Sequence, residues 1–183
     1  SRGNPTIEAE VFVKNQSAIA ICPSGASTGT FEAFEKRDIN NKRYLGKSVL
    51  NAISLVNTKI SNKLKGQSIH NQERIDSIMI NLDGTRQKTK LGANSILAVS
   101  LAVAKAAAKE SNKQLFHYIG GESAVELPIP MMNILNGGSH ADNSIDFQEF
   151  MIMPVAASSF SEALKIGVEI FHHLKQELKD YGY

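Results

Sequence analysis

The chain has 183 residues, of which 42% are hydrophobic and 21% are charged, and its formal net charge at pH 7 is +2. This is the composition of an ordinary globular protein, and it excludes a disordered or low-complexity chain. Lysines and arginines are scattered among acidic residues without a basic stripe, so the sequence indicates no binding of nucleic acid. The most apolar stretch, residues 96–104, is far shorter than the ~20 residues that cross a bilayer, and we expect no membrane span.

A single cysteine, Cys22, cannot form a disulfide within the chain. This usage fits a reducing cytoplasm, and we expect Cys22 to be a small buried side chain. The chain begins at Ser1 without a charged and apolar leader, and it ends inside an expected helix near Tyr183. We therefore expect a piece of a longer protein, cut at both ends.

The first predicted elements are a hairpin and a helix. Apolar and polar residues alternate over residues 6–13 and again over residues 17–22, which predicts two antiparallel strands. Apolar residues at helical spacing then predict an amphipathic helix over residues 45–64.

Two further helices and a boundary follow. A short helix is expected to begin after an Asn71 cap and to end at the turn formed by residues 83–84. Alanines and aliphatic residues occupy nearly every face of residues 94–109, which predicts a helix buried on most sides and central to its domain. Gly120-Gly121 then interrupts the pattern, and we expect a second domain to begin near Glu122.

The second domain is expected to open with strands. Residues 131–135 and 149–155 are short apolar runs bounded by glycine and proline, as is typical of strands buried on both faces. Ser159 and Glu162 have the spacing of a capping box, so a helix should begin there. Its apolar stripe is predicted to consist of Phe160, Leu164, Phe171, Leu174 and Leu178.

The first candidate site is a loop of small residues, Pro23-Ser24-Gly25-Ala26-Ser27-Thr28-Gly29, directly after a predicted strand. Its glycines free the backbone, and its hydroxyls and carbonyls could reach a phosphate or a hard cation. It is not a Walker A sequence, because no lysine follows Gly29. From the residues alone, an ordinary surface turn remains an alternative to a ligand-closing loop.

The second candidate site is Asn136-Gly137-Gly138-Ser139-His140-Ala141-Asp142-Asn143, followed by Gln148-Glu149-Phe150. Loops at the ends of two successive strands can direct a histidine and an acid into one pocket. A histidine held in a purely structural hydrogen bond and a solvated glutamate remain the alternative, and spacing alone does not decide.

Two other groups of residues are weaker candidates. His172 and His173 are adjacent on a predicted helix, so their side chains diverge by about 100° and cannot share one metal ion; we interpret them as structural. Asp142, Asp146 and Glu149 resemble a carboxylate cluster, but their spacing is not that of an EF-hand loop.

In series, several motifs closely resemble the enolase family and cover essentially the whole chain. The motifs are Ser1-Arg2-Gly3-Asn4-Pro5-Thr6, the residue 23–29 loop, Leu82-Asp83-Gly84-Thr85, Leu91-Gly92-Ala93-Asn94, and residues 136–143 with Gln148-Glu149-Phe150-Met151. They come in the enolase order, and the chain would account for less than half of a full-length enolase.

The resemblance implies the reversible dehydration of 2-phosphoglycerate to phosphoenolpyruvate, with Mg²⁺ as cofactor. It implies that Ser27 closes onto a second magnesium ion through its hydroxyl and carbonyl oxygens. His140 would lie against the substrate near its phosphate, Gln148 would face the substrate, and Glu149 would polarise the departing hydroxyl.

The resemblance also implies a fold and an assembly. Residues 1–121 would form the α+β N-terminal domain, and residues 122–183 would begin an enolase-type α/β barrel. The general-base lysine, a further active-site glutamate and the three carboxylates of the first magnesium would lie beyond Tyr183, so this piece alone should be inactive. The full-length protein is expected to be a cytoplasmic homodimer, with the secondary cell-surface or secreted pool reported for enolases.

Two alternatives stay open beside an enzyme. The first is a non-catalytic binding protein at a surface or in an assembly, favoured if the natural chain ends near Tyr183. The second is a structural or regulatory phosphate-binding module that uses only the Ser27 loop and His140.

Overall fold

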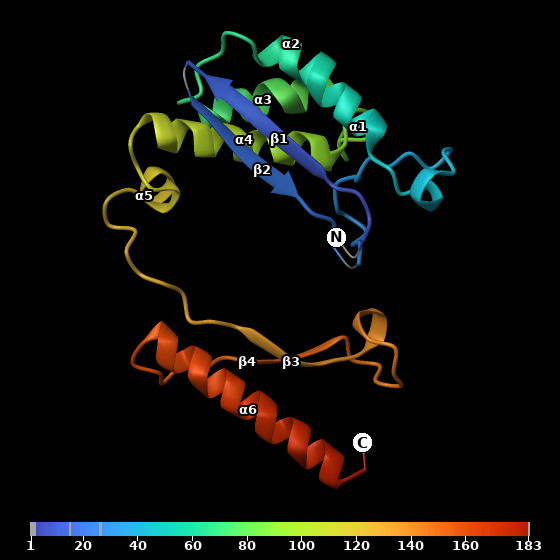
Figure 1. Cartoon of the computed structure of the whole chain (residues 1–183), viewed down its shortest axis with the longest axis vertical. Coiled ribbons are helices and arrows are strands. Elements are labelled where there is room, and N and C mark those ends of the chain that lie inside the picture. Colours follow the sequence, from blue (N-terminus) through green and yellow to red (C-terminus); the bar gives the residue numbers. More distant parts are fainter. Residues whose placement is uncertain (1–2, 15, 26, 183) are drawn as a thin grey trace. The chain divides into compact units, whose positions relative to one another are not determined.

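The computed structural model describes residues 3–14, 16–25 and 27–182. The chain divides into two compact units, residues 1–124 and 125–183 (Figure 1). The division falls between Ala124 and Val125. The domain boundary expected after Gly121 stays a prediction.

The first unit opens with the predicted hairpin. Strands β1 (Ile7–Val13) and β2 (Gln16–Cys22) pair antiparallel, in a register that runs from Ile7 opposite Cys22 to Val13 opposite Gln16. Ile7 and Ala9 are buried while Glu8 and Glu10 are exposed, so the predicted alternation is confirmed. The buried face packs on helix α4 (Ala93–Glu110) (Figure 1).

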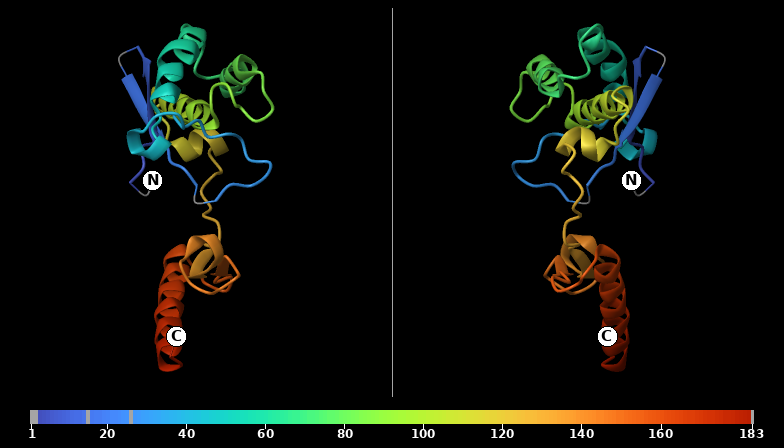
Figure 2. Two further views of the ribbon diagram at one scale, coloured as in Figure 1. Left: turned by 90° about the vertical axis from the view of Figure 1, so that its right-hand side faces the viewer. Right: turned by 90° about the vertical axis from the view of Figure 1, so that its left-hand side faces the viewer.

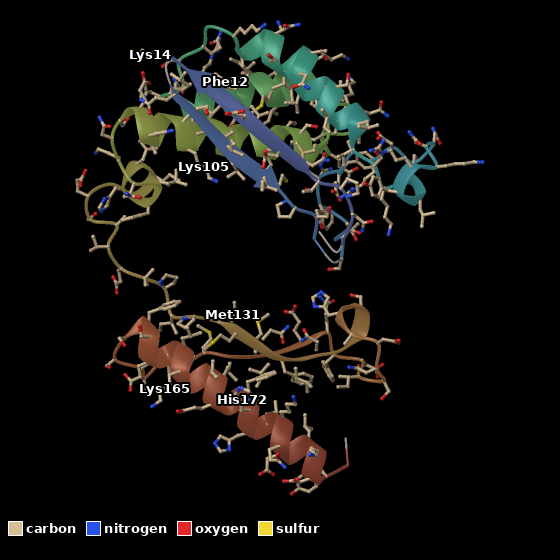
Figure 3. The ribbon with its side chains drawn as sticks, in the orientation of Figure 1. Phe12, Lys14, Lys105, Met131, Lys165 and His172 are labelled. Atoms are coloured by element: carbon tan, nitrogen blue, oxygen red, sulfur yellow. The ribbon has the colours of Figure 1, made fainter. Side chains whose placement is uncertain are left out.

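Helix α4 also bonds to one edge of this hairpin. Lys105 Nζ donates to the carbonyl of Ile19 at 3.1 Å (Figure 3), and Lys109 Nζ donates to the carbonyl of Ser17 at 3.0 Å. Ten residues of α4 are buried, on nearly every face of the helix. The prediction of a central helix buried on most sides is therefore confirmed.

The helix predicted over residues 45–64 begins later than expected. A 3₁₀ turn, η1 (Arg43–Gly46), precedes it, and helix α1 (Leu50–Leu55) continues through a π-helical turn, η2 (Val56–Ile60), into α2 (Ser61–Leu64). The carboxylate of Asp38 accepts hydrogen bonds from the backbone N–H groups of Leu50 and Asn51, at 2.7 and 3.1 Å. Because these are the free donors of a helix N-terminus, Asp38 sets the start of α1.

Two shorter helices complete the first unit. Helix α3 (Gln72–Asp83) begins as predicted, since Asn71 Oδ1 accepts from the Arg74 N–H at 2.9 Å, and it ends at Gly84. Helix α5 (Leu115–Gly120) was not predicted. The core of the unit is formed by residues of the hairpin and of the helices together.

The second unit contains a second hairpin and a long helix. Strands β3 (Met132–Asn136) and β4 (Glu149–Ile152) pair antiparallel and are joined through a 3₁₀ turn, η3 (Gly138–His140). The prediction that both faces of these strands are buried is wrong, because Met151 is 47% exposed and Asn133 is also exposed. Helix α6 (Phe160–Asp180) covers only one face of the hairpin (Figure 2).

Helix α6 begins at the predicted cap but packs through different residues. Ser159 Oγ accepts from the Glu162 N–H at 3.2 Å, while the Glu162 carboxylate accepts from the N–H of Ser158 at 2.8 Å rather than from Ser159. The buried residues are Ala163 and Gly167, so the predicted stripe is wrong in part. Its members Phe160, Leu164 and Phe171 are exposed.

Candidate functional site

His140 lies between two polar side chains of the second unit. Its Nδ1 atom is 2.8 Å from Glu149 Oε1, and its Nε2 atom is 2.9 Å from Gln148 Nε2. Because an amide nitrogen only donates, Nε2 accepts a hydrogen bond from Gln148, and the ring proton on Nδ1 is donated to Glu149. The two neighbours together hold the imidazole in one tautomer and one orientation.

The backbone of the β3–β4 hairpin brings these three residues together. Asn136 at the end of β3 is paired with Glu149 at the start of β4. The Gly137 N–H donates to the carbonyl of Gln148 at 3.0 Å, and the Gly138 N–H donates to the carbonyl of Ile145 at 2.7 Å. The connection between the strands is therefore folded back on itself, with His140 facing the first residues of β4.

Glycine is required at residue 137 for this arrangement. A Cβ atom there would lie 2.5 Å from the carbonyl oxygen of Phe147 and 2.6 Å from that of Ile145. Backbone atoms cannot move aside as a flexible side chain can. The glycine of the predicted motif thus has a steric reason that the sequence pattern did not reveal.

The cluster is partly open to solvent. The side chains of His140 and Glu149 are 18% and 29% exposed, and Gln148 is an exposed residue. A small anionic ligand could therefore reach the imidazole edge and the carboxyl group without any displacement of buried side chains. We refer to His140, Gln148 and Glu149 as the histidine cluster.

The other acids of this region do not join the cluster to form a metal centre. Asp142 and Asp146 are exposed. Within residues 3–14, 16–25 and 27–182, no three His, Cys, Asp or Glu side chains gather closely enough to hold an ion. His172 and His173 are both exposed on α6.

Ser27 belongs to the first unit and is exposed. Ala26 of the same loop lies outside the described residues. After the loop, the chain turns where the Glu32 N–H donates to the Gly29 carbonyl at 3.1 Å and the Glu32 carboxylate accepts from the Gly29 N–H at 2.9 Å. The two candidate sites of the sequence thus lie in different units.

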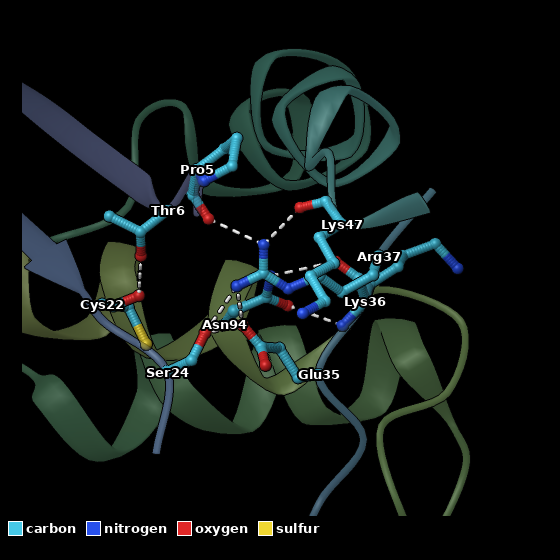
Figure 4. Close-up of polar contacts among 9 residues, drawn as sticks. All are labelled: Pro5, Thr6, Cys22, Ser24, Glu35, Lys36, Arg37, Lys47 and Asn94. Carbon is cyan, nitrogen blue, oxygen red and sulfur yellow. Dashed lines mark hydrogen bonds and ion pairs between the residues drawn. The ribbon is translucent and has the colours of Figure 1, made fainter. Parts of the chain in front are cut away.

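At the start of the loop the structure reveals polar residues that sequence reasoning missed. Ser24 is hydrogen-bonded to Glu35 and Arg37 (Figure 4). The signal in the sequence is faint, since an acid and an arginine two residues apart are common on any exposed strand. Cys22 is buried, as predicted, and burial together with the nearby charge of Glu35 raises the pKa of its thiol.

No helix in the described part of the chain combines the length and the apolar character needed to span a membrane.

Comparison with known proteins gives two consistent findings. The family described as "Enolase, N-terminal domain" matches residues 1–119, and the family described as "Enolase, C-terminal TIM barrel domain" matches residues 124–183. An enolase from Pelagibacter ubique strain HTCC1062 is 62% identical over 176 residues, which cover 96% of this chain and 42% of that relative. The chain thus spans well under half the length of the relative, and the expected fold, an α+β domain followed by the start of a barrel, is confirmed.

Proposed function

Because this chain belongs to the enolase family, we propose that the protein containing it catalyses the magnesium-dependent, reversible dehydration of 2-phosphoglycerate to phosphoenolpyruvate. The observation that carries this proposal is the histidine cluster, in which His140 bonds to both Gln148 and Glu149. A partly exposed acid beside an oriented imidazole provides what an anionic hydroxy acid requires for binding and for loss of its hydroxyl.

Glu149 is the residue that acts on the leaving group. Hydroxide is a poor leaving group, so its departure needs a proton or a strong hydrogen bond. Glu149 Oε1 accepts from His140 Nδ1, and the other oxygen, Oε2, would carry the proton and donate it to the substrate hydroxyl from the exposed side of the carboxyl group. Gln148 faces the same ligand and offers an amide group for orienting it.

His140 binds the substrate near its phosphate. Its ring is already fixed by Gln148 and Glu149, so little side-chain freedom is lost when the anion arrives.

The oxygen atoms of Ser27 are of the kind that Mg²⁺ prefers, but they are too few to hold the ion alone. Mg²⁺ prefers about six hard oxygen ligands and retains several waters. The exposed Ser27 offers a hydroxyl and a carbonyl oxygen, and the remaining ligands would come from substrate, water and other parts of the protein. When bound, the ion supplies positive charge beside the substrate carboxylate, where negative charge increases as the C2 proton leaves.

The resemblance assigns the general-base lysine and the carboxylates of the first magnesium to positions after residue 183. We propose accordingly that residues 1–183 alone are inactive, and that the full-length protein is a cytoplasmic homodimer. The exposed loop at Ser27 and the histidine cluster would both be needed for turnover.

The test is formation of phosphoenolpyruvate from 2-phosphoglycerate by the full-length protein, with and without Mg²⁺, beside residues 1–183 alone. We expect turnover by the full-length protein only, abolished by chelation and restored by added Mg²⁺. Absence of turnover by a well-folded full-length protein would reject the enzyme and favour the non-catalytic binding protein. Turnover by residues 1–183 alone would reject the proposal that catalysis also needs residues after residue 183.

A further inference from the structure

Arg37 makes four hydrogen bonds near the loop that carries Ser27. Its Nη1 donates to the carbonyls of Pro5 and Lys47, at 2.7 and 2.5 Å. Its Nη2 donates to Ser24 Oγ at 2.5 Å and to Glu35 Oε1 at 2.7 Å (Figure 4). Only 14% of the side chain is exposed, and its bonds to Pro5, Ser24 and Glu35 are partly buried.

Ser24 connects this network to the loop. Its Oγ accepts from Arg37 and donates to Glu35 Oε1, at 2.5 Å in each case. Arg37 and Glu35 form an ion pair with each other, and hydrogen bonds to charged groups are the stronger ones. Ser24 precedes Ser27 by three positions, so the start of the loop is fixed to the segment of residues 35–37.

That segment is in turn fixed to the start of α4. The Lys36 N–H donates to Asn94 Oδ1 at 3.0 Å, and Asn94 Nδ2 donates to the Lys36 carbonyl at 3.1 Å (Figure 4). Asn94 is buried, and α4 is the central helix of the unit. A continuous set of bonds thus runs from the buried helix through Arg37 to Ser24.

We propose that Arg37 is a positioning residue that fixes the base of the loop and so limits where the Ser27 oxygens can lie. This proposal rests on the proposed role of Ser27 as a metal ligand. A guanidinium group is needed because one planar fork serves four acceptors placed around it. The ammonium group of a lysine has three donors on a single atom and cannot span the distance from Pro5 to Glu35.

Freeing the base of the loop should weaken metal binding more than it slows the chemical step. Ordering even one additional backbone residue on binding reduces affinity by roughly ten-fold. We therefore expect the apparent dissociation constant of the activating Mg²⁺ to rise about ten-fold in an Arg37 variant, with a smaller change in kcat at saturating Mg²⁺.

The experiment compares the full-length protein with its Arg37→Met, Arg37→Lys and Arg43→Met variants. Arg43 is an exposed arginine outside the network and serves as the matched control. Amide hydrogen exchange over residues 27–31 is measured first, without metal or substrate, and the Mg²⁺ dependence of kcat and KM is measured second. Exchange does not depend on the protein being an enzyme.

We expect faster exchange over residues 27–31 in both Arg37 variants, with the amides of α4 unchanged, and wild-type behaviour in Arg43→Met. If Arg37→Met loosens the whole unit, Arg37→Lys decides, since it keeps the charge and loses only the fork. Unchanged exchange in Arg37→Lys would overturn the proposal. A Mg²⁺ dependence equal to that of the wild type in both Arg37→Met and Arg37→Lys would overturn it as well. A wild-type protein without turnover would reject the proposed function instead, while the exchange data would still decide the role of Arg37 in the loop.

Discussion

The two compact units differ in what holds their polar residues in place. In the first unit, buried residues from the hairpin and from several helices form one core, and Arg37 and Asp38 are bonded onto its rim. In the second unit, the buried residues among those described are Gly137, Ala163 and Gly167. The geometry of the histidine cluster therefore depends on strand pairing and local hydrogen bonds, and much less on apolar burial.

This difference teaches that a candidate site and a well-packed core need not coincide. A site built from a tight turn between two strands is set by short-range backbone geometry. A loop tied by long-range bonds to a buried helix is set by the stability of the whole unit. Substitutions should separate these two kinds of support.

The largest expected effect tests the chemistry of the second unit. In the full-length protein, Glu149→Gln should lower kcat by roughly 10²–10⁴-fold, because the amide cannot supply the proton that the leaving hydroxyl needs. Steady-state kinetics measures this. The matched control is Glu169→Gln, on an exposed α6 carboxylate that lies 3.6 Å from Lys165. A loss of activity of less than ten-fold in Glu149→Gln would remove Glu149 from the reaction.

The next largest effect concerns burial. Met79 is fully buried in the first unit, whereas Met153 in the second unit is 50% exposed. Met79→Ala should destabilise the full-length protein by about 2–5 kcal/mol, because it leaves a cavity, while Met153→Ala should change stability by less than about 0.5 kcal/mol. Urea denaturation gives both values. Equal losses of stability in Met79→Ala and Met153→Ala would show that the two units do not differ in how tightly their side chains are packed.

A third pair of variants tests glycines within the second unit. A Cβ at Gly137 would meet the carbonyls of Phe147 and Ile145, while a Cβ at Gly167 would meet side chains, most closely the terminal atoms of the flexible Met132. Gly137→Ala should cost about 1–3 kcal/mol and disturb the bond between His140 and Glu149. Gly167→Ala should be milder, because Met132 can change rotamer. Thermal denaturation and the histidine NMR shifts of the full-length protein measure these effects. A larger effect of Gly167→Ala than of Gly137→Ala would contradict the prediction.

The last expected effect is a pH dependence that belongs to the first unit. Burial raises the pKa of Asp38, but hydrogen bonds from the Asn51 and Leu50 N–H groups and from the Ser48 and Asn51 side chains outweigh it, so the pKa is lowered overall. The stabilising contribution of Asp38 is thus present above its unfolded pKa of about 3.9 and is lost as the pH falls below that value through the folded pKa.

Asp38→Asn should therefore destabilise the protein by about 1–3 kcal/mol at pH 7 and should reduce the loss of stability between neutral pH and about pH 3. Urea denaturation across this range measures both. Asp146→Asn, at an exposed aspartate of the second unit, is the control. An acid dependence of Asp38→Asn equal to that of the wild type would show that the carboxylate contributes nothing to it.

Sequence reasoning succeeded where short-range patterns determine the structure. The alternation of residues 6–13 and the cap at Asn71 depend on neighbours in the chain, and both appear as predicted. The start of α1 was placed too early because its cap, Asp38, comes from twelve residues before Leu50. A helical pattern does not reveal a cap supplied from a distance.

The candidate site was predictable in its residues but not in its geometry. The resemblance pointed to His140, Gln148 and Glu149, and spacing alone left a structural histidine open. That His140 bonds to both partners follows from the register of β3 with β4 and from the close contacts at Gly137. The burial of β3 and β4 was overestimated, because an apolar run does not say how many faces have a partner.

The two lysines that extend from α4 to β2 affect the tendency of the protein to aggregate. An unpaired strand edge is a template on which another extended chain can add, and it is a common origin of aggregation. Lys105 and Lys109 occupy the carbonyls of Ile19 and Ser17, and they place two positive charges along that edge. A second strand could pair there only by displacing both ammonium groups, so the lysines disfavour growth of the hairpin into an intermolecular sheet.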